Sequence, residues 1–455
     1  MALQSMNPTN GGVIARYEEA SDTELSQALG RVTPAFADWR TRSFAERGGW
    51  LRAAATELRG RAAGFARLMA LEMGKPLAQG RAEVEKCAWV CDYFAEQAEG
   101  FLADQPIATE WRRSYAAFQP LGAILAVMPW NFPFWQVFRA AAPALMAGNV
   151  MLLKHASNVT GCALAIAAVF ERAGFPPGVF QVLRIGAQSV GAVIDHDAVR
   201  AVTLTGSTPA GRAVAAIAGR ALKKTVLELG GSDPYVVLED ADLEAAAEAC
   251  VTARLINTGQ SCIAAKRFIV VADVRHRFEE LVVERMRSRR VGDPLQEDVD
   301  LGPMARVDLR DGVHCQVVAS RDAGARVLLG GAVPEEAGAF YPPTVLTDVR
   351  PGMPAFDEET FGPVAAIVAA PNEAAAIDLA NATPFGLGAA VFTRDLERGE
   401  RLARERLEAG CCFVNAFVRS DPRLPFGGVR LSGYGRELGL LGMREFVNAK
   451  SVCVA

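Results

Sequence analysis

The sequence lacks the residue spacings that mark a disulfide framework or a zinc site. It has nine cysteines in 455 residues, an odd number at irregular intervals with no Cys-x-x-Cys pair, and only four histidines. Small secreted proteins are cross-linked by paired cysteines, and structural zinc needs four closely spaced Cys or His ligands. We therefore expect no metal site, and we expect the reducing cytoplasm, in which thiols persist.

An excess of basic charge and a long apolar run are also missing. The formal net charge is −4, which gives no positive field for nucleic acid. The most apolar span, residues 121–153, is interrupted by prolines, asparagine and arginine, and the first 29 residues lack a basic segment followed by an apolar one. We therefore expect neither a membrane span nor a secretory leader.

The chain does have length and a regular change of pattern. Because 455 residues exceed what one hydrophobic core supports, two or more domains are expected. Residues 22–100 show the apolar spacing of helices, whereas short apolar runs alternate with helical stretches after residue 120. Two such successions follow one another, which predicts an α/β fold of two layers with parallel sheets covered on both faces.

Cys262 stands in the segment NTGQSC, after a predicted helix over residues 242–256. Gly259 breaks that helix, so the thiol is offered from a loop. A nucleophilic cysteine needs its thiolate form, and an ordinary thiol has a pKa near ~8.5. Most intracellular cysteines are small buried hydrophobes, so the segment by itself is compatible with either role.

Glu228 lies inside the apolar segment VLELGG, which is predicted to be a strand running into two glycines. A carboxylate in such a strand is costly unless it finds a partner or its pKa moves upward. Two interpretations follow from this placement. Glu228 is either half of a buried salt bridge or a general base tuned toward neutral pH.

Two strand ends in the first α/β layer carry the features of a nucleotide site. In LTGSTPAG a strand ends, Gly206 permits a tight turn, and Ser207 caps the following helix, whose free N–H groups suit an anion. In PWNFP, Trp130 and Asn131 follow another strand, and Lys154 ends the next one. Ligands of open α/β sheets bind at this edge, although the pattern is not the usual GxGxxG fingerprint.

Seven segments occur in the order and spacing of one known family: PWNFP, LTGSTPAG, LELGGSDP, NTGQSC, EETFGPV, NATPFGLGAAVFT and PFGGVRLSGYGRE. On these segments the chain resembles the aldehyde dehydrogenase superfamily over essentially its whole length. The segment LLKHA, after the first cofactor strand, is similar to the short bacterial type of succinate-semialdehyde dehydrogenase.

This resemblance implies two doubly wound α/β domains and a small β oligomerisation arm. Residues 1–229 would form the NAD(P)-binding domain, with residues 101–120 contributing to the arm. Residues 230–415 would form the catalytic domain, and residues 416–455 the return segment and the rest of the arm. Because such an arm extends a neighbour's sheet, a homodimer or homotetramer is expected.

The resemblance also implies a chemistry. Cys262 attacks the aldehyde to give a thiohemiacetal, whose oxyanion is held by the Asn131 amide and the Cys262 backbone N–H. After hydride transfer, Glu228 activates the water that releases the acid from the thioester. Glu437 matches a second carboxylate near the proton exit path. The family's cofactor contacts fall on Trp130, Lys154, Gly206, Ser207, Leu229, Glu359 and Phe361.

Two positions bear on cofactor and substrate choice. An acid in place of Ser157 would repel a 2′-phosphate, so with serine there we expect that NAD and NADP are both used. In the substrate tunnel, Arg139 is expected to fork onto the distal carboxylate of succinate semialdehyde. A second arginine of longer relatives is replaced by Ile256, and Arg423 with Ser420 would supply that half of the clamp.

Three alternatives remain beside oxidation of succinate semialdehyde to succinate. One is an aldehyde dehydrogenase for another semialdehyde or for an aliphatic or aromatic aldehyde, since tunnel shape is not visible in the sequence. Another is a CoA-acylating dehydrogenase, against which Glu228 argues as a water activator. The last is a non-catalytic family member, which the intact Cys262, Glu228 and Asn131 disfavour.

Overall fold

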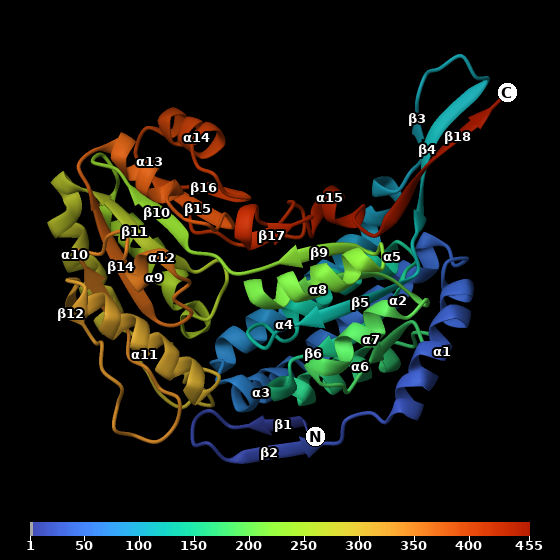
Figure 1. Ribbon diagram of the computed structural model, residues 1–455, viewed down its shortest axis with the longest axis horizontal. Helices are drawn as coiled ribbons and strands as arrows, with labels where there is room; N and C mark the ends of the chain where they lie inside the picture. Colours follow the sequence, from blue (N-terminus) through green and yellow to red (C-terminus); the bar gives the residue numbers. More distant parts are fainter. Residues whose placement is uncertain (1–2) are drawn as a thin grey trace.

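The computed structural model describes residues 3–455 as two α/β bodies, one of which carries a projecting arm (Figure 1). The first body is built on a six-stranded sheet in the order β17-β9-β8-β5-β6-β7, parallel except for its edge strand β17. Its strands are β5 (Ala123–Met128), β6 (Val150–His155), β7 (Phe180–Val182), β8 (Val199–Thr205), β9 (Lys224–Glu228) and β17 (Gly433–Tyr434).

Helices join this sheet in one hydrophobic core, which includes the completely buried helix α5. The first two helices start with capping boxes, Ser21 with Glu24 and Ser43 with Glu46, which satisfy N–H groups that a helix start leaves free. A hairpin of β1 (Leu3–Met6) and β2 (Val13–Tyr17) precedes them. The helices are α1 (Asp22–Trp39), α2 (Phe44–Gly60), α3 (Ala62–Met73), α4 (Leu77–Phe101), α5 (Trp135–Met146), α6 (Thr160–Arg172), α7 (Val190–Asp195) and α8 (Thr208–Arg220), with short 3-10 turns at η1 (Ser157–Val159) and η2 (Ala187–Ser189).

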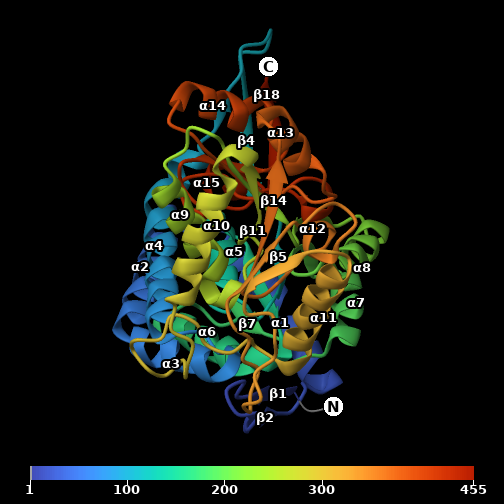
Figure 2. The same cartoon turned by 90° about the vertical axis from the view of Figure 1, so that its left-hand side faces the viewer.

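The second body has a seven-stranded sheet in the order β12-β13-β14-β11-β10-β15-β16, parallel except for the pair β12–β13. Alternate residues of its inner strand β10 face two cores: Tyr235 packs in one core with α9 and α10, and Val236 in the other with α11 and α13. Figure 2 shows α9 and α10 on one side of this body and α11 and α12 on the other. The elements are β10 (Asp233–Val237), α9 (Leu243–Leu255), η3 (Ile256–Gly259), β11 (Ala265–Val271), α10 (Ala272–Arg287), α11 (Val307–Asp322), β12 (Arg326–Leu329), β13 (Thr344–Thr347), α12 (Pro354–Asp357), β14 (Val364–Ala370), α13 (Glu373–Asn381), β15 (Gly388–Phe392), α14 (Leu396–Glu405) and β16 (Cys411–Val414).

The arm is a three-stranded antiparallel sheet in the order β18-β4-β3, made from two distant parts of the chain. Its strands are β3 (Gln105–Pro106), β4 (Arg113–Pro120) and β18 (Val447–Val454). The chain returns from the second body through η4 (Arg430–Ser432), β17 and α15 (Gly439–Met443) before it enters the arm, as the red segment of Figure 1 shows. The return segment therefore contributes an edge strand to the first sheet on its way.

The α/β class predicted from the alternating pattern is confirmed by the two parallel-rich sheets. The end of the helix before Cys262 was placed too late, because α9 stops at Leu255 and the next residues form a 3-10 turn. Asn257 turns into the left-handed region, and its backbone N–H donates to the Gln79 side chain, 2.7 Å away, from another helix. A tertiary contact thus ends the helix. Among residues 3–455 no helix is long and apolar enough to cross a membrane.

Gly259, which closes this turn, has a backbone that only glycine adopts easily. Its φ is +75°, and a Cβ atom there would lie 2.2 Å from the carbonyl oxygen of Gly362. We expect Gly259→Ala to cost at least about 2 kcal/mol of stability, since strain and a backbone clash add together. The measurement is the melting temperature, which should fall by several degrees.

Gly64 supplies the matched control for this substitution. It lies in α3, and no heavy atom lies within 4 Å of the position that its Cβ would take. Gly64→Ala should leave the melting temperature unchanged or raise it slightly, because alanine favours the helix. Equal melting temperatures for the two variants would contradict the placement of Gly259.

Candidate active site

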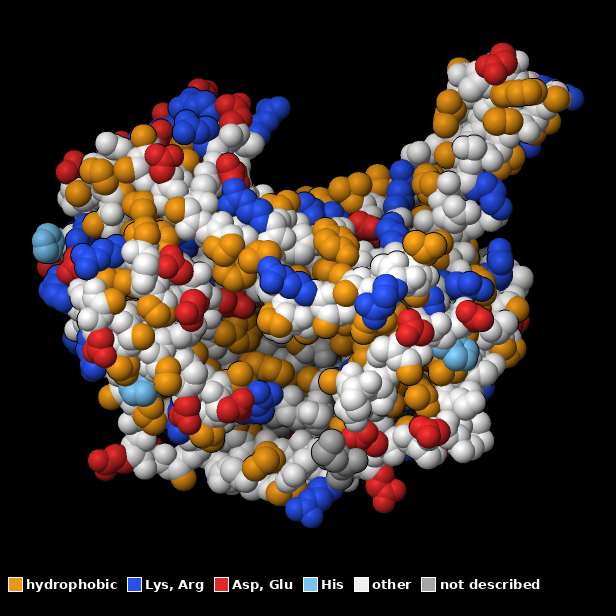
Figure 3. All heavy atoms as spheres, in the orientation of Figure 1, with side chains coloured by type: hydrophobic (Ala, Val, Ile, Leu, Met, Phe, Trp, Pro, Cys, Tyr) orange, Lys and Arg blue, Asp and Glu red, His pale blue; other side chains and the backbone are white. Residues whose placement is uncertain are grey.

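The thiol of Cys262 lies in the wall between two cavities. One, of about 310 Å³, is bounded by α4, α5, the segment around Cys262 and the loop after β16. Aromatic and aliphatic side chains such as Phe132, Ile263 and Phe426 line it beside polar ones, and we call it the apolar cavity. The other, of about 260 Å³, lies at the carboxyl ends of β5, β8 and β9, and we call it the edge cavity. Among the described residues that line them, Cys262 is common to both. The surface is hollowed between the two bodies, and hydrophobic side chains gather there (Figure 3).

The edge cavity brings together most of the residues predicted to contact a cofactor. Its lining includes Trp130, Gly206, Ser207, Leu229, Glu359 and Phe361, together with Asn131. Ser207 caps α8, as predicted, because its side chain accepts a hydrogen bond from the Ala210 N–H. Lys154 and Ser157 do not line this cavity. Lys154 lies near the end of β6, and Ser157 is the first residue of η1. Burial lowers the pKa of Lys154.

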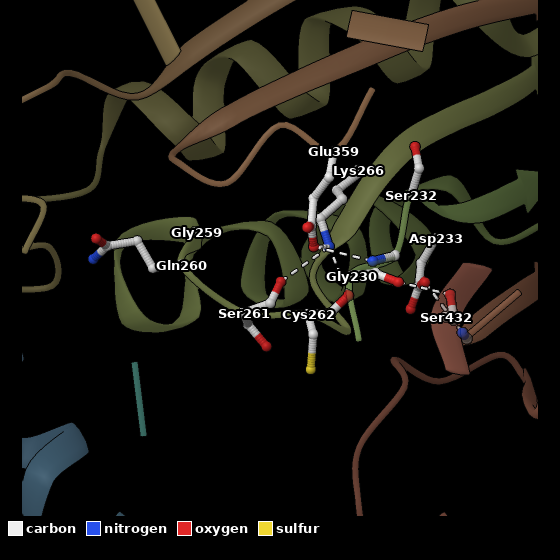
Figure 4. A network of polar contacts seen from close by, with 12 residues as sticks. Gly230, Ser232, Asp233, Gly259, Gln260, Ser261, Cys262, Lys266, Glu359 and Ser432 are labelled. Atoms are coloured by element: carbon white, nitrogen blue, oxygen red, sulfur yellow. Dashed lines mark hydrogen bonds and ion pairs between the residues drawn. The ribbon is translucent and has the colours of Figure 1, made fainter. Parts of the chain in front are cut away.

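A buried lysine fixes the backbone beneath the thiol (Figure 4). Lys266 donates to the carbonyl oxygens of Ser261, at 3.0 Å, and Cys262, at 2.6 Å. It also lies 3.4 Å from the Glu359 carboxylate, which accepts a hydrogen bond from the Gly231 N–H at 3.0 Å. The Cys262 side chain points away from this network (Figure 4). Lys266 therefore holds both the main chain of Cys262 and Glu359, a predicted cofactor contact.

The loop that carries Asn131 is fixed from three directions. Its backbone carbonyl accepts hydrogen bonds from Lys75, at 3.0 Å, and from the Asn257 side chain, at 2.7 Å. Its side-chain amide donates to the Gln260 carbonyl at 3.2 Å. Two of these partners belong to the turn just before Cys262. The amide predicted to hold the oxyanion is therefore tied to the segment that carries the thiol.

A buried ion pair between Lys75 and Glu83 supports the same loop. The second oxygen of Glu83 accepts from the backbone N–H groups of Phe134 and Trp135, both at 2.9 Å, where α5 starts. A buried pair is tolerated when further hydrogen bonds satisfy its charges, as they do here. The sequence reasoning missed both residues, although Glu83 shares a helix face with the buried Cys87 and Cys91, which is a detectable signal.

Glu228 ends β9 with 2% of its surface exposed, and neither carboxylate oxygen has a hydrogen-bond donor. Burial raises the pKa of this carboxyl group well above its ordinary value; nearby Arg139 counteracts the rise and Glu437 adds to it. The sequence allowed two interpretations of Glu228, a buried salt bridge or a general base. Because the described residues form no salt bridge with it, the structure favours the second. Its carboxyl group is a neutral acid that gains its charge only at higher pH.

Arg139 and Glu437 form a buried ion pair beside Glu228. The Arg139 guanidinium also donates to the Thr205 hydroxyl at 3.2 Å and stacks 4.8 Å from the centre of the Phe426 ring. Arg139 lines the apolar cavity, as expected from the sequence. Its charge is, however, already balanced by the Glu437 carboxylate.

The other half of the expected clamp is only partly in place. Ser420 lines the apolar cavity, whereas Arg423 does not; its side chain is 64% exposed and forks onto Asp421 at 2.9 and 2.7 Å. The short spacing between Asp421 and Arg423 satisfies the guanidinium locally. Arg423 instead lines a neighbouring cavity together with Lys86 and Ser420. Its expected contact with the substrate stays a prediction.

The comparisons with known proteins agree with this arrangement. A profile of the aldehyde dehydrogenase family matches residues 1–452. The chain belongs to the aldehyde dehydrogenase family. The resemblance seen in the seven sequence segments is thereby confirmed, and so is the fold that it implied.

Relatives in this family match the chain from end to end. A probable NADP(+) succinate-semialdehyde dehydrogenase of Synechocystis is 51% identical over 455 residues, and the NADP(+) succinate-semialdehyde dehydrogenase 1 of Mycobacterium tuberculosis is 50% identical over 458, with 100% of each chain covered. The crystal structure of the succinic semialdehyde dehydrogenase of Streptococcus pyogenes in complex with NADP+ is 36% identical, with a TM-score of 0.97 and 100% of both chains covered.

The environment of Cys262 predicts how the thiol of this family member reacts. Burial raises its pKa to about 12, and the positive charges of Arg139 and Lys266 oppose the rise. In the coenzyme-free enzyme, the alkylation rate with iodoacetamide should therefore increase about tenfold per pH unit between pH 7 and 9, since only the thiolate reacts. Peptide mass mapping after timed quenching measures this rate site by site.

The exposed Cys315 serves as a comparator in the same samples. At pH 7, Cys262 should be alkylated much more slowly than Cys315. A rate at Cys262 that is already independent of pH below 8 would contradict the buried, protonated thiol.

Proposed function

We propose that the protein oxidises succinate semialdehyde to succinate with NADP or NAD as the hydride acceptor. The observation that carries the proposal is the position of Cys262 between an edge cavity lined by predicted cofactor contacts and an apolar cavity with cationic groups in its lining. Two relatives at 50–51% identity, named as NADP(+) succinate-semialdehyde dehydrogenases, support the same substrate.

The edge cavity fits a nicotinamide dinucleotide. It opens at the carboxyl ends of parallel strands and beside the start of α8, where free N–H groups favour a pyrophosphate. Trp130 and Phe361 stand edge to face, with ring centres 5.8 Å apart, and form an aromatic wall next to the thiol. When bound, the nicotinamide supplies the hydride acceptor of the reaction.

In the proposed mechanism, Cys262 reacts as its thiolate, after the thiol proton has passed to solvent. The thiolate sulfur bonds to the aldehyde carbon, and the electron pair of the C=O π bond moves to oxygen, which becomes an oxyanion. The Asn131 amide and the Cys262 backbone N–H stabilise that charge in a site held by Lys75 and Lys266. Loss of hydride leaves a thioester on Cys262. Glu228 then accepts a proton from water as the water attacks the thioester carbon, which releases the acid and the thiolate.

Cofactor preference rests on the carboxyl end of β6 and the 3-10 turn that follows it, with half-buried Lys154 and exposed Ser157. Lys154 and Ser157 stand there, and both can donate a hydrogen bond to a 2′-phosphate. Ser157→Glu places a negative charge at this position, so kcat/KM with NADP should fall at least about tenfold through repulsion of the phosphate. The value with NAD should change less than about threefold, because an acid can bind a ribose hydroxyl.

Ser157→Ala is the control for this cofactor test, because it removes the hydroxyl without adding charge. It should lower kcat/KM with NADP by only a few-fold. Equal losses with NADP and NAD in Ser157→Glu would show that the segment does not contact the 2′ position.

The activity itself is tested with a panel of aldehydes and each cofactor, followed by absorbance of the reduced nicotinamide. Succinate semialdehyde should give a higher kcat/KM than butanal, which has the same chain length without the carboxylate. Cys262→Ala should abolish turnover of every aldehyde. A requirement for CoA would instead indicate an acylating dehydrogenase, and turnover in Cys262→Ala would refute the covalent route.

We further propose that the arm joins this chain to a second copy as a homodimer or homotetramer. Its tip exposes Ile107 and Trp111, at 54% and 47% of their surfaces, and β18 offers an edge for strand addition. All nine cysteines are free thiols, which supports residence in a reducing cytoplasm. Light scattering of the purified protein measures the oligomeric state, and a monomer at micromolar concentration would refute the proposed oligomer.

A further inference from the structure

The apolar cavity contains four charged residues, and three of them are already accounted for or exposed. Glu83 is paired with Lys75, Arg139 is paired with Glu437, and Arg419 is exposed to solvent. Lys86, on α4, is the fourth. Among residues 3–455, no carboxylate lies within ion-pair distance of it.

Lys86 is nevertheless held in one position. Its ammonium group donates to the Ser420 hydroxyl at 2.8 Å and lies 4.3 Å from the centre of the Trp135 ring. Burial and, to a smaller extent, the nearby charge of Arg139 together lower the pKa of Lys86 to about 8. Asp421 and Glu83 lie near enough to oppose this shift, but neither is in ion-pair contact with the ammonium group. A largely buried cation without a direct ion-pair partner is costly, so an anion that enters this cavity is favoured there.

We propose that Lys86 and Ser420 bind the distal carboxylate of the aldehyde substrate in place of an arginine clamp. The Ser420 oxygen accepts from Lys86, which leaves the hydroxyl hydrogen free to donate to the same carboxylate. Two groups on different segments, α4 and the loop after β16, thus converge on one anion.

The rest of the cavity fits a short chain between this anion site and the thiol. Phe132, Ile256, Ile263 and Phe417 line it, and Cys262 belongs to the same lining. Ile256, which stands where longer relatives have an arginine, contributes apolar surface suited to methylene groups. The proposal rests on the proposed function, because it assigns the residues that select a carboxylated aldehyde.

Arg139 has a different role in this account. Its guanidinium is divided between Glu437, the Thr205 hydroxyl and the Phe426 ring. Release of Arg139 to the substrate would leave Glu437 as a second uncompensated carboxylate beside Glu228, which is costly in a buried site. Arg139 is therefore a positioning residue for the two carboxylates.

The test compares succinate semialdehyde with butanal in Lys86→Met, which keeps the length of the side chain and removes its charge. KM for succinate semialdehyde should rise at least about twentyfold, the scale of one lost charged hydrogen bond. The change for butanal should be several times smaller. Lys86→Arg should recover part of the loss, because it restores a cation at the same place.

Two further variants keep the test decisive. Ser420→Ala should raise KM for succinate semialdehyde about fivefold, because it removes one neutral hydrogen-bond donor to the carboxylate. If Lys86→Met does not fold, this variant provides the test instead. Arg423→Met removes the exposed arginine outside the cavity, and its effect on KM for succinate semialdehyde should stay below that of Ser420→Ala.

The outcomes separate this proposal from the proposed function. If the unaltered enzyme prefers succinate semialdehyde to butanal and Lys86→Met loses that preference, the assignment holds. If the preference exists but Lys86→Met affects both substrates equally, or Arg423→Met has the larger effect, the Lys86 assignment is wrong. If the unaltered enzyme shows no preference for the carboxylated aldehyde, the proposed function fails first.

Discussion

The buried ion pair between Arg139 and Glu437 is the contact on which the site depends. It joins helix α5 of the first sheet to the return segment, which has come back from the second body. Because both charges are desolvated, neither can leave its partner without leaving the other uncompensated. The pair therefore fixes the return segment beside Glu228, and in our proposal it keeps Arg139 from binding the substrate.

Two charged or titratable groups of the site, Glu228 and Lys86, make no direct ion pair among the described residues. Glu228 has no donor, so burial raises its pKa, and its ionised form is a stronger base toward water than an ordinary carboxylate. Lys86 has only a hydroxyl and an aromatic ring as partners, which leaves its charge for an incoming anion. Two further ion pairs, Lys75 with Glu83 and Lys266 with Glu359, hold the loop that carries Asn131 and the backbone of Cys262.

The features that a linear pattern specifies were predictable from the sequence, and contacts between distant segments were not. The strand ends that carry Glu228 and Ser207, and the loop that offers Cys262, follow from local periodicity and turn chemistry. Lys86 reads as an ordinary lysine on the surface of a helix, because its partner Ser420 is contributed by a loop near the other end of the chain. Arg139 was assigned to the substrate because its neutralising carboxylate, Glu437, is equally remote in sequence. The early end of α9 has the same cause, a hydrogen bond from Asn257 to Gln79.

The allocation of charge in the apolar cavity is the central claim, and it is tested most directly by a crystal structure of the Cys262→Ala variant with succinate semialdehyde bound. The account predicts that the substrate carboxylate lies within hydrogen-bond distance of the Lys86 ammonium and the Ser420 hydroxyl, while Arg139 remains on Glu437. A carboxylate bound by Arg139, with Glu437 displaced, would contradict it.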